Sequence, residues 1–268
     1  MGDRQRFALG LSYQGTAYHG WQTQDNLPCV QTLLEEALSR VAAHPVSVIC
    51  AGRTDAGVHA SEQIIHFDTE AVRDEYAWLM GTNSYLPPDI SVQWVKAVSA
   101  NFHARLRATS RCYRYVIYNS PIRPGILHNA VTWHYRALNV AAMHEAAQHW
   151  VGEHDFSSFR SSVCQAKTPH RKIHAIEIHQ QQSLIVIEVI GNAFLHHMVR
   201  NMVGVLFLIG QGFKKTRWAL EVLEAKDRRV AGMMAPANGL YLTKISYPAE
   251  FGLPITPNGP FFLAGSLL

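Results

Sequence analysis

The sequence predicts a mixed α/β protein made of two ferredoxin-like domains, with mixed or antiparallel sheets that flank a basic cleft. The first observation is the spacing of apolar residues, which switches between strand and helix periods in the order β-α-β-β-α-β. The second is a further run of mixed strand and helix signals in the rest of the chain. The third is the length of 268 residues, which suits two modest domains.

The first domain is expected over residues 1–104. Apolar residues alternate with smaller ones from Phe7 to Tyr13, which predicts a strand, and follow helical spacing from Val30 to Ala42. Pro87 and Pro88 close the next helical region, because the residue before a proline avoids helical geometry. The remaining elements are expected at residues 46–51, 63–67 and 91–98 as strands, and at about 72–83 as a helix.

The second domain is expected over residues 105–268. A strong amphipathic stripe from Leu195 to Phe207 predicts a helix. Asn139 and Thr216 are suitable N-caps for two further helices, one to residue 150 and one to about residue 225. Strands are expected at residues 110–118, 130–135, 173–179, 184–190 and 240–247, with the third and fourth forming a hairpin.

Composition excludes several classes of protein. Hydrophobic residues make up 48% of the chain and charged residues 16%, which is not the composition of a disordered protein. No two of the four cysteines lie within four residues of each other, so zinc-ribbon and dithiol redox spacings are absent. The first residues resemble no signal peptide, and the longest apolar run, 202–210, is too short to span a bilayer. We therefore expect a reduced, cytoplasmic protein with no membrane partner.

The net charge of +4 is unevenly distributed. Residues 1–89 hold 5 Lys and Arg against 11 Asp and Glu, whereas residues 90–268 hold 19 against 9. No acidic residue lies between Asp89 and Glu145, or between Phe156 and Ile176. Uninterrupted positive stretches attract polyanions, so this distribution favours a nucleic acid as partner over a solvated surface without one.

The segment Gly52–Ala60, GRTDAGVHA, lies between two predicted strands and is therefore a loop. Its glycines permit a tight backbone path, and Asp55 is its one carboxylate, flanked by Arg53 and His59. Taken alone, Asp55 could equally hydrogen-bond its own loop in an Asx-turn. The segment lacks the glycine and lysine spacing of phosphate-binding loops.

This loop resembles the catalytic loop of the tRNA pseudouridine synthase A family, which modifies the anticodon stem-loop. The resemblance covers nearly the whole chain, from Gly10 to Ala264, because further segments match in family order. Those segments are GLSYQGTAYHGWQ, NFHARLRATSRCYRYVIYN, DFSSFR, NAFLHHMVRNMVG, ANGLYL and GPFFLA.

The resemblance implies an isomerase that converts uridine to pseudouridine at tRNA positions 38, 39 and 40 without metal or cofactor, with Asp55 as the essential aspartate. Asp55 would act either as a nucleophile or as a base, and both roles need an ionised carboxylate. The resemblance also implies a homodimer that binds one tRNA across both subunits.

Four residues match supporting positions of the family. Arg200 corresponds to the arginine that pairs with the catalytic aspartate, and a forked cation would keep a desolvated carboxylate ionised. Arg53 corresponds to the arginine that holds the extruded nucleotide, and Tyr113 to the tyrosine that stacks on the base. Leu240 resembles a pocket leucine on the last strand.

Nine cations are candidate contacts to RNA phosphates: Arg105, Arg107, Arg111, Arg114, Lys167, Arg171, Lys172, Lys214 and Lys215. His196 and His197 are expected on the helix of Arg200, where adjacent side chains diverge and cannot hold one ion together, so no metal site is expected. Two other functions stay open. One is a non-catalytic RNA-binding or RNA-chaperone protein of the same fold, and the other is a hydrolase that uses Asp55 and His59.

Overall fold

The structure is a computed structural model that describes residues 4–263, so Ala264 at the end of GPFFLA lies outside the described residues. The chain forms two compact units. Of the described residues, 4–109 and 242–263 form the first unit and 110–241 the second. The expected division into domains, 1–104 and 105–268, stays a prediction. The sequence analysis did not foresee that residues 242–263 belong to the first compact unit.

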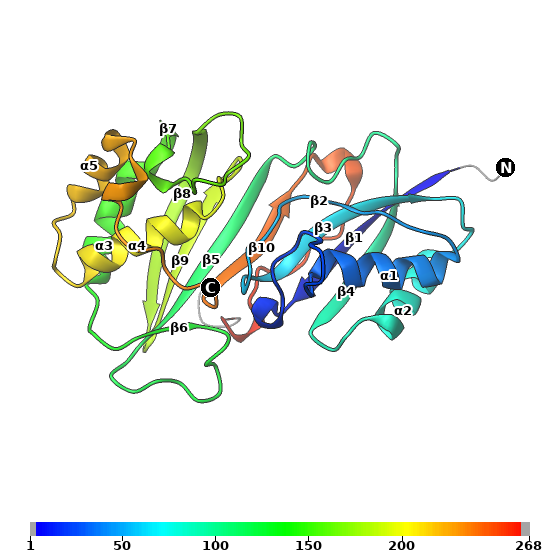
Figure 1. The fold of residues 1–268 in the computed structure, drawn as a ribbon, viewed down its shortest axis with the longest axis horizontal. Helices are drawn as coiled ribbons and strands as arrows, with labels where there is room; N and C mark the ends of the chain where they lie inside the picture. Colours follow the sequence, from blue (N-terminus) through cyan, green and yellow to red (C-terminus); the bar gives the residue numbers. More distant parts are fainter. Residues whose placement is uncertain (1–3, 264–268) are drawn as a thin grey trace. The chain divides into compact units, whose positions relative to one another are not determined.

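The first unit follows the predicted order β-α-β-β-α-β. Its elements are β1 (Gln5–Tyr13), α1 (Val30–Ala42), β2 (Ile49–Cys50), β3 (His59–Thr69), α2 (Glu75–Tyr85) and β4 (Ile90–Val98). β1 pairs with both β4 and β3, and β2 pairs with β3, all antiparallel. β10 (Leu240–Ser246) lies along β3. Figure 1 shows α1 and α2 side by side over the sheet.

Three buried aromatic rings form the core between this sheet and its helices. Phe7 and Phe67 lie opposite each other on β1 and β3, with ring centroids 5.7 Å apart. Trp78 of α2 packs on both, at 5.7 and 5.0 Å. Contacts of this size contribute beyond simple burial, so the alternating apolar residues of β1 fix which face of the strand meets the helices.

The second unit is also mixed. Its elements are β5 (Ser110–Asn119), β6 (Thr132–His134), α3 (Val140–Ala147), β7 (Gly152–Asp155), β8 (His170–Gln181), β9 (Leu184–Gly191), α4 (Met198–Gly210) and α5 (Trp218–Ala225). The antiparallel order is β5-β9-β8-β7, and β6 joins β5 in parallel. The predicted hairpin of β8 and β9 is confirmed. Figure 1 shows α3, α4 and α5 grouped beside this sheet.

Buried aromatic residues also organise the second unit. Trp150 packs edge-on against Phe159 at 5.1 Å and donates its indole N–H to the carbonyl of Ala219 in α5. Tyr115 of β5 meets Phe207 of α4 at 6.4 Å, so α4 covers the face of β5 that carries Tyr115. The predicted N-cap of α3 is confirmed, because the Asn139 side chain accepts the N–H of Ala142.

Two local predictions about helices were wrong. α4 begins at Met198 and not at Leu195, because His197 has a left-handed backbone with φ 65°. Thr216 does not cap α5, because its hydroxyl donates to the Glu145 carboxylate at 2.8 Å instead. The first error follows from apolar spacing, which a short turn satisfies as well as a helix does. The second follows from residue preference, because a threonine suited to an N-cap can hydrogen-bond a distant side chain instead.

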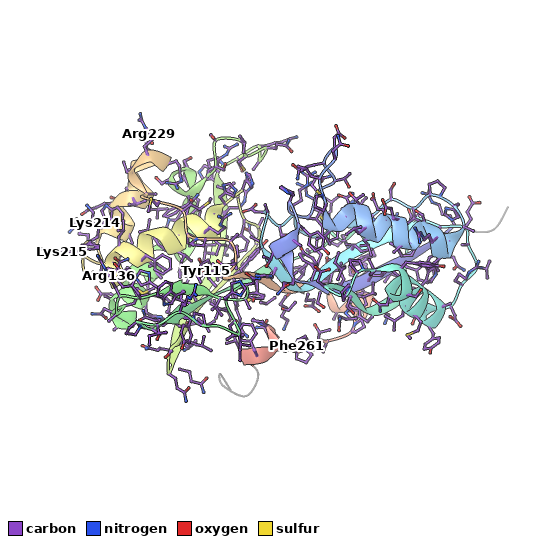
Figure 2. All side chains as sticks on the ribbon, turned by 60° about the horizontal axis from the view of Figure 1, so that its bottom comes forward. Tyr115, Arg136, Lys214, Lys215, Arg229 and Phe261 are labelled. Carbon is purple, nitrogen blue, oxygen red and sulfur yellow. The ribbon has the colours of Figure 1, made fainter. Side chains whose placement is uncertain are left out.

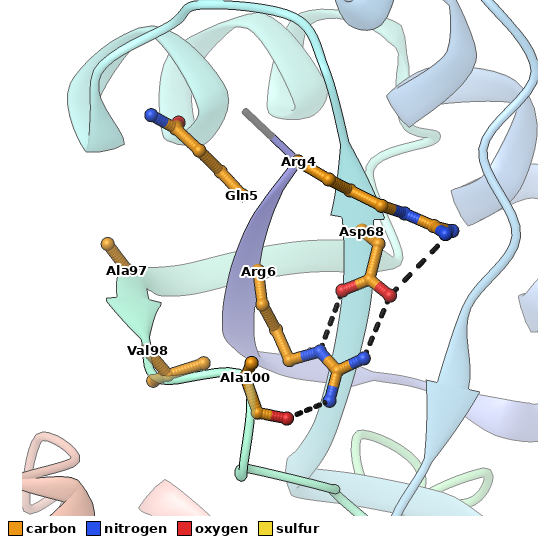
Figure 3. A pocket seen from close by; sticks show the side chains of 7 residues that line it. All are labelled: Arg4, Gln5, Arg6, Asp68, Ala97, Val98 and Ala100. Carbon is orange, nitrogen blue, oxygen red and sulfur yellow. Dashed lines mark hydrogen bonds and ion pairs between the residues drawn. The ribbon is translucent and has the colours of Figure 1, made fainter. Parts of the chain in front are cut away.

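Among residues 4–263, no helix is both long and apolar enough to cross a membrane. A shallow hollow of about 550 Å³ lies where β1 begins (Figure 3). Within it, the Arg6 guanidinium binds the Asp68 carboxylate at 2.7 and 2.8 Å and lowers the pKa of that carboxyl. Since the hollow lies at the opposite end of β1 from Tyr13, it is separate from the loop that carries Asp55.

Candidate active site

The segment with Asp55 is an irregular loop between β2 and β3, as the sequence predicts. Its side chains differ in exposure: Arg53 is exposed, Asp55 is half-buried, and Thr54 between them is only 7% exposed. The amide of Val58 donates to the carbonyl of Asp55 at 3.1 Å, and Gly57 has φ 78°. The loop therefore turns tightly just after the carboxylate, which explains the glycine at position 57.

The end of β1 and the residues that follow it hold this loop through its backbone and one side chain. The Tyr13 hydroxyl lies 2.7 Å from Thr54 Oγ1. The amide of Trp21 donates to the Thr54 carbonyl at 3.0 Å, and the amide of Gly57 donates to the Tyr18 carbonyl at 3.2 Å. The N-terminal segment that resembled the family thus lies against the segment with Asp55.

His59 is a structural residue of the same region. Its ring is 1% exposed, and Nδ1 accepts the amide N–H of Gly15 at 3.0 Å. A ring that accepts at Nδ1 is the neutral form that carries its proton on Nε2. Because this imidazole is enclosed by protein, the geometry disfavours a hydrolase that would use His59 with Asp55.

Gln63 is a site residue that the sequence analysis did not single out. Its side-chain amide donates to the Gly52 carbonyl at 2.5 Å and accepts the Gly52 amide at 3.4 Å, so it holds both backbone groups at the start of the loop. The signal in the sequence was a polar residue directly before Ile64 and Ile65 on β3, and the structure shows that its side chain is fully buried. Polar residues in such runs are hydrogen-bonded when buried, so they mark backbone that is held in place.

Two cations act on the half-buried thiol of Cys50, which directly precedes the loop. Burial raises the pKa of Cys50 to about 11, and the nearby charges of Arg53 and Arg105 oppose the rise. Cys50 is therefore a protonated thiol at neutral pH and not a nucleophile. Arg105 is therefore close enough to Cys50, which precedes the Asp55 loop, for its charge to act on that thiol.

Arg200 lies in the first turn of α4, in the second unit. Its Nε donates to the Ala235 carbonyl at 2.9 Å, and the Ala235 amide donates back to the Arg200 carbonyl at 3.1 Å. Gly204, one turn further along α4, lets residues 233–235 approach the helix closely, because a Cβ at this position would lie 2.0 Å from the Met233 carbonyl oxygen. The guanidinium orientation is thus set by residues 233–235.

The same segment leads into Leu240. The Tyr115 hydroxyl donates to the Pro236 carbonyl at 2.9 Å and bonds Thr132 Oγ1 at 2.7 Å. The amide of Leu240 donates to the Ala237 carbonyl, also at 2.9 Å. Arg200 and Leu240 are therefore joined through one hydrogen-bonded segment, and Leu240 is buried at the start of β10.

Tyr113 lies on β5 opposite Val189 and packs edge-on against Phe194, with ring centroids 5.0 Å apart. The ring is 8% exposed, so the structure shows a packed side chain and not an open stacking surface. Tyr115, two residues further along β5, is fully buried. Stacking of Tyr113 on a base stays a prediction.

The nine candidate phosphate contacts fall into two groups. Four are held by protein groups: Arg111 by the Asn192 carbonyl, Arg114 by Glu188 at 2.6 Å, Arg107 by Glu250 at 3.0 Å, and Arg171 by the Thr168 and His170 carbonyls. The other five are exposed, as Arg107 also is: Arg105, Lys167, Lys172, Lys214 and Lys215. Of these, Lys214 lies over the Trp218 ring at 5.0 Å. Exposed cations suit phosphate contacts better, because ion-paired ones must first lose a partner.

The expectation for His196 and His197 rested on an incorrect premise. Both residues precede α4, so the divergence of adjacent helical side chains does not apply to them. Their ring centroids lie only 3.9 Å apart. The left-handed backbone at His197 brings the two rings together on the approach to Arg200.

The first unit thus carries Asp55 on an anchored loop, and the second unit carries Arg200 and the paired rings of His196 and His197. A fixed carboxylate and exposed cations suit an enzyme that acts on an anionic substrate. A family profile described as tRNA pseudouridine synthase matches residues 11–106 and 146–248. A tRNA pseudouridine synthase A of Coxiella burnetii is 58% identical over 96% of this chain and 99% of its own. Those of Pseudomonas aeruginosa and Aeromonas salmonicida are 56% and 54% identical, over 97% of this chain and 92% and 97% of theirs. The chain belongs to the tRNA pseudouridine synthase family.

Proposed function

We propose that the protein converts uridine to pseudouridine on the 3′ side of the tRNA anticodon stem-loop. The observation that carries the proposal is Asp55, presented on a loop whose backbone is held by hydrogen bonds before and after the carboxylate. A reacting carboxylate needs a fixed position, and such anchoring supplies it. The family to which the chain belongs supports the reaction and the substrate.

The reaction breaks the bond between uracil N1 and ribose C1′ and forms a bond between C5 and the same C1′. A proton leaves C5 and N1 gains one, so no cofactor or metal is required. We propose Asp55 as the group that acts at the reacting sugar or base, either as nucleophile or as proton acceptor. Both roles need the ionised carboxylate.

Four other residues support this chemistry in the proposal. Arg200 keeps the carboxylate ionised and oriented, because a cation beside a carboxyl lowers its pKa. Arg53, exposed next to Asp55, holds the backbone of the extruded nucleotide. Tyr113 stacks on the flipped base, and Leu240 packs against it.

The tRNA binds chiefly through phosphates in this proposal. Exposed cations occur in the loop before β8 and after α4, where Lys214 and Lys215 lie at the same end of the second unit as Arg136 (Figure 2). Contacts of this kind recognise shape and charge instead of sequence. The enzyme acts in the cytoplasm, where unmodified tRNA is available.

We also propose a homodimer. Large apolar side chains are exposed in the second unit, including Ile126 at 99% and the rings of Trp133, Tyr135 and Phe213. The Arg136 guanidinium lies over the rings of Tyr135 and Phe213, at 5.4 and 5.5 Å. Exposed apolar groups of this size are typical of protein interfaces, and a second copy of the chain would cover them.

The test is pseudouridine mapping of an unmodified tRNA transcript incubated with the wild type or Asp55→Asn, in chelator and without nucleotide. We expect pseudouridine on the 3′ side of the anticodon stem-loop from the wild type only, with tRNA affinity retained in the variant. Tight binding without product from either protein would support the RNA-binding alternative. Strand cleavage or free uracil would support the hydrolase.

A further inference from the structure

Thr54, the residue that immediately precedes Asp55, is fixed through both its side chain and its backbone. Its hydroxyl bonds the Tyr13 hydroxyl, and its carbonyl accepts the Trp21 amide. Both hydroxyls of the first bond are buried. Two anchors on one residue leave its peptide plane little freedom, so the direction in which the chain enters Asp55 is set here.

The group that anchors Thr54 comes from a rigid element. Tyr13 is the last residue of β1, and it lies opposite Ala60 on β3. Its ring is buried and lies 6.1 Å from the ring of Trp21, which is itself buried. A side chain locked by packing on a strand holds its polar atom more accurately than one on a loop.

The backbone of residues 15–20 packs closely against the loop. A Cβ at Gly15 would lie 1.9 Å from the Val58 carbonyl, and one at Gly20 would lie 2.7 Å from the Thr54 carbonyl. Gly20 also has φ 93°, which disfavours other residues. Residues 13–21 therefore pack tightly against the loop. Within this segment, the Tyr13 side chain hydrogen-bonds to Thr54, the residue directly before Asp55.

We propose that Tyr13 is a positioning residue for Asp55: through Thr54 Oγ1 its hydroxyl fixes the backbone that carries the reacting carboxylate. This inference rests on the proposed function, since it assigns Tyr13 a role in the same site. Tyr13 acts through Thr54 and needs no contact with the RNA. Its loss should therefore lower kcat and leave tRNA affinity unchanged.

The experiment compares Tyr13→Phe, Thr54→Val, the double variant and Thr54→Ser. Displacement of a reacting group by about 1 Å can cost 100-fold in rate, so we expect kcat to fall about 10- to 100-fold in both single variants. The double variant should be no slower than the worse single variant, because both substitutions remove one hydrogen bond. Thr54→Ser keeps the hydroxyl and should retain kcat. The Kd for tRNA should stay within about three-fold of the wild-type value in all four.

Tyr247→Phe is the matched control. The Tyr247 hydroxyl donates to the Ala104 carbonyl in the same unit, outside the Asp55 loop, so this variant also loses one tyrosine hydroxyl. Hydrogen exchange provides a readout that needs no catalysis: the amides of Gly57 and Val58 should exchange faster in Tyr13→Phe and unchanged in Tyr247→Phe.

The outcomes separate this inference from the proposed function. A wild type that forms no pseudouridine contradicts the proposed function, while the exchange measurement still tests the anchor. An active wild type with an equally active Tyr13→Phe and unchanged exchange overturns the positioning role. Equal losses of kcat in Tyr13→Phe and Tyr247→Phe would also overturn it, because they would reflect general destabilisation.

Discussion

Arg200 and Ala235 hold each other by two hydrogen bonds: Arg200 Nε donates to the Ala235 carbonyl, and the Ala235 amide donates to the Arg200 carbonyl. The first bond is donated by Nε, the guanidinium nitrogen that is bonded to the aliphatic part of the side chain. It therefore fixes the plane of the guanidinium group. Orientation, and not charge alone, is therefore the property that the fold builds into Arg200.

Arg200→Lys tests that distinction, because lysine keeps the charge but lacks Nε and the planar fork. We expect kcat to fall by about 100-fold, as when a reacting site loses about 1 Å of precision. The fold should survive, since one hydrogen bond contributes about 1 kcal/mol. Turnover and melting temperature should be measured together; a lysine variant with wild-type kcat would show that charge suffices.

Gly20→Ala probes the packing of the N-terminal segment against the Asp55 loop. The substitution combines an unfavourable positive φ with a clash against the Thr54 carbonyl. Gly212→Ala is the matched control, because Gly212 has φ 78° but no atom within 4 Å of an added Cβ. We expect the control to lose only about 1–2 kcal/mol of stability, which is the cost of a left-handed backbone at a residue with a Cβ, and to keep its activity.

Gly20→Ala should lose more stability than the control and also lose turnover, because the Thr54 backbone must move. Urea unfolding and pseudouridine formation measure the two effects. Equal stability and equal activity of the two variants would contradict tight packing of residues 13–21 against the loop.

Local elements were predictable where one physical rule dominated. The helix of Val30–Ala42 was placed to the residue, since its apolar stripe and its limits coincide. The order of the first unit followed from periodicity, and GRTDAGVHA was placed as a loop because apolar strands flank it. The resemblance indicated Asp55, which spacing alone left open to an Asx-turn.

Features that depend on distant parts of the chain were not predictable. Val46–Ala51 was expected as a strand, but only Ile49–Cys50 pairs with β3. Pairing needs a partner with open backbone groups, which periodicity does not report. Arg111 was a phosphate candidate by charge, yet it is buried and bonds the Asn192 carbonyl on a neighbouring segment. Charge counts cannot reveal such partners.

The salt dependence of tRNA binding should identify which exposed cations contact phosphates. Each lost contact lowers the slope of log K against log salt concentration by about 1. We expect Lys214→Ala with Lys215→Ala to lower it by about 1–2. Arg229→Ala is the control: Arg229 is also exposed in the second unit (Figure 2) but is ion-paired with Asp227 at 2.6 Å. An unchanged slope in the lysine variant would remove these two residues from the interface.

The stability of the first unit should fall in mild acid because of His66. Burial, then the charges of Arg6 and His103, lower the pKa of this ring to about 4. The unfolded chain binds the proton near pH 6.5, so stability is full above pH 6.5 and falls as the pH drops toward 4. One pKa unit corresponds to about 1.4 kcal/mol, and with partial screening by solvent the loss should be about 2 kcal/mol.

His66→Asn provides the matching test. His66 Nδ1 accepts the Ala104 amide at 3.1 Å, and the asparagine Oδ1 can accept the same N–H without titrating. Urea unfolding from pH 7.5 to 4.5 should therefore show a flatter profile for the variant than for the wild type. Some slope should remain, because burial also lowers the pKa of His134 in the second unit. Identical profiles would mean that His66 does not control acid stability, and a variant destabilised equally at every pH would show that only its hydrogen bond matters.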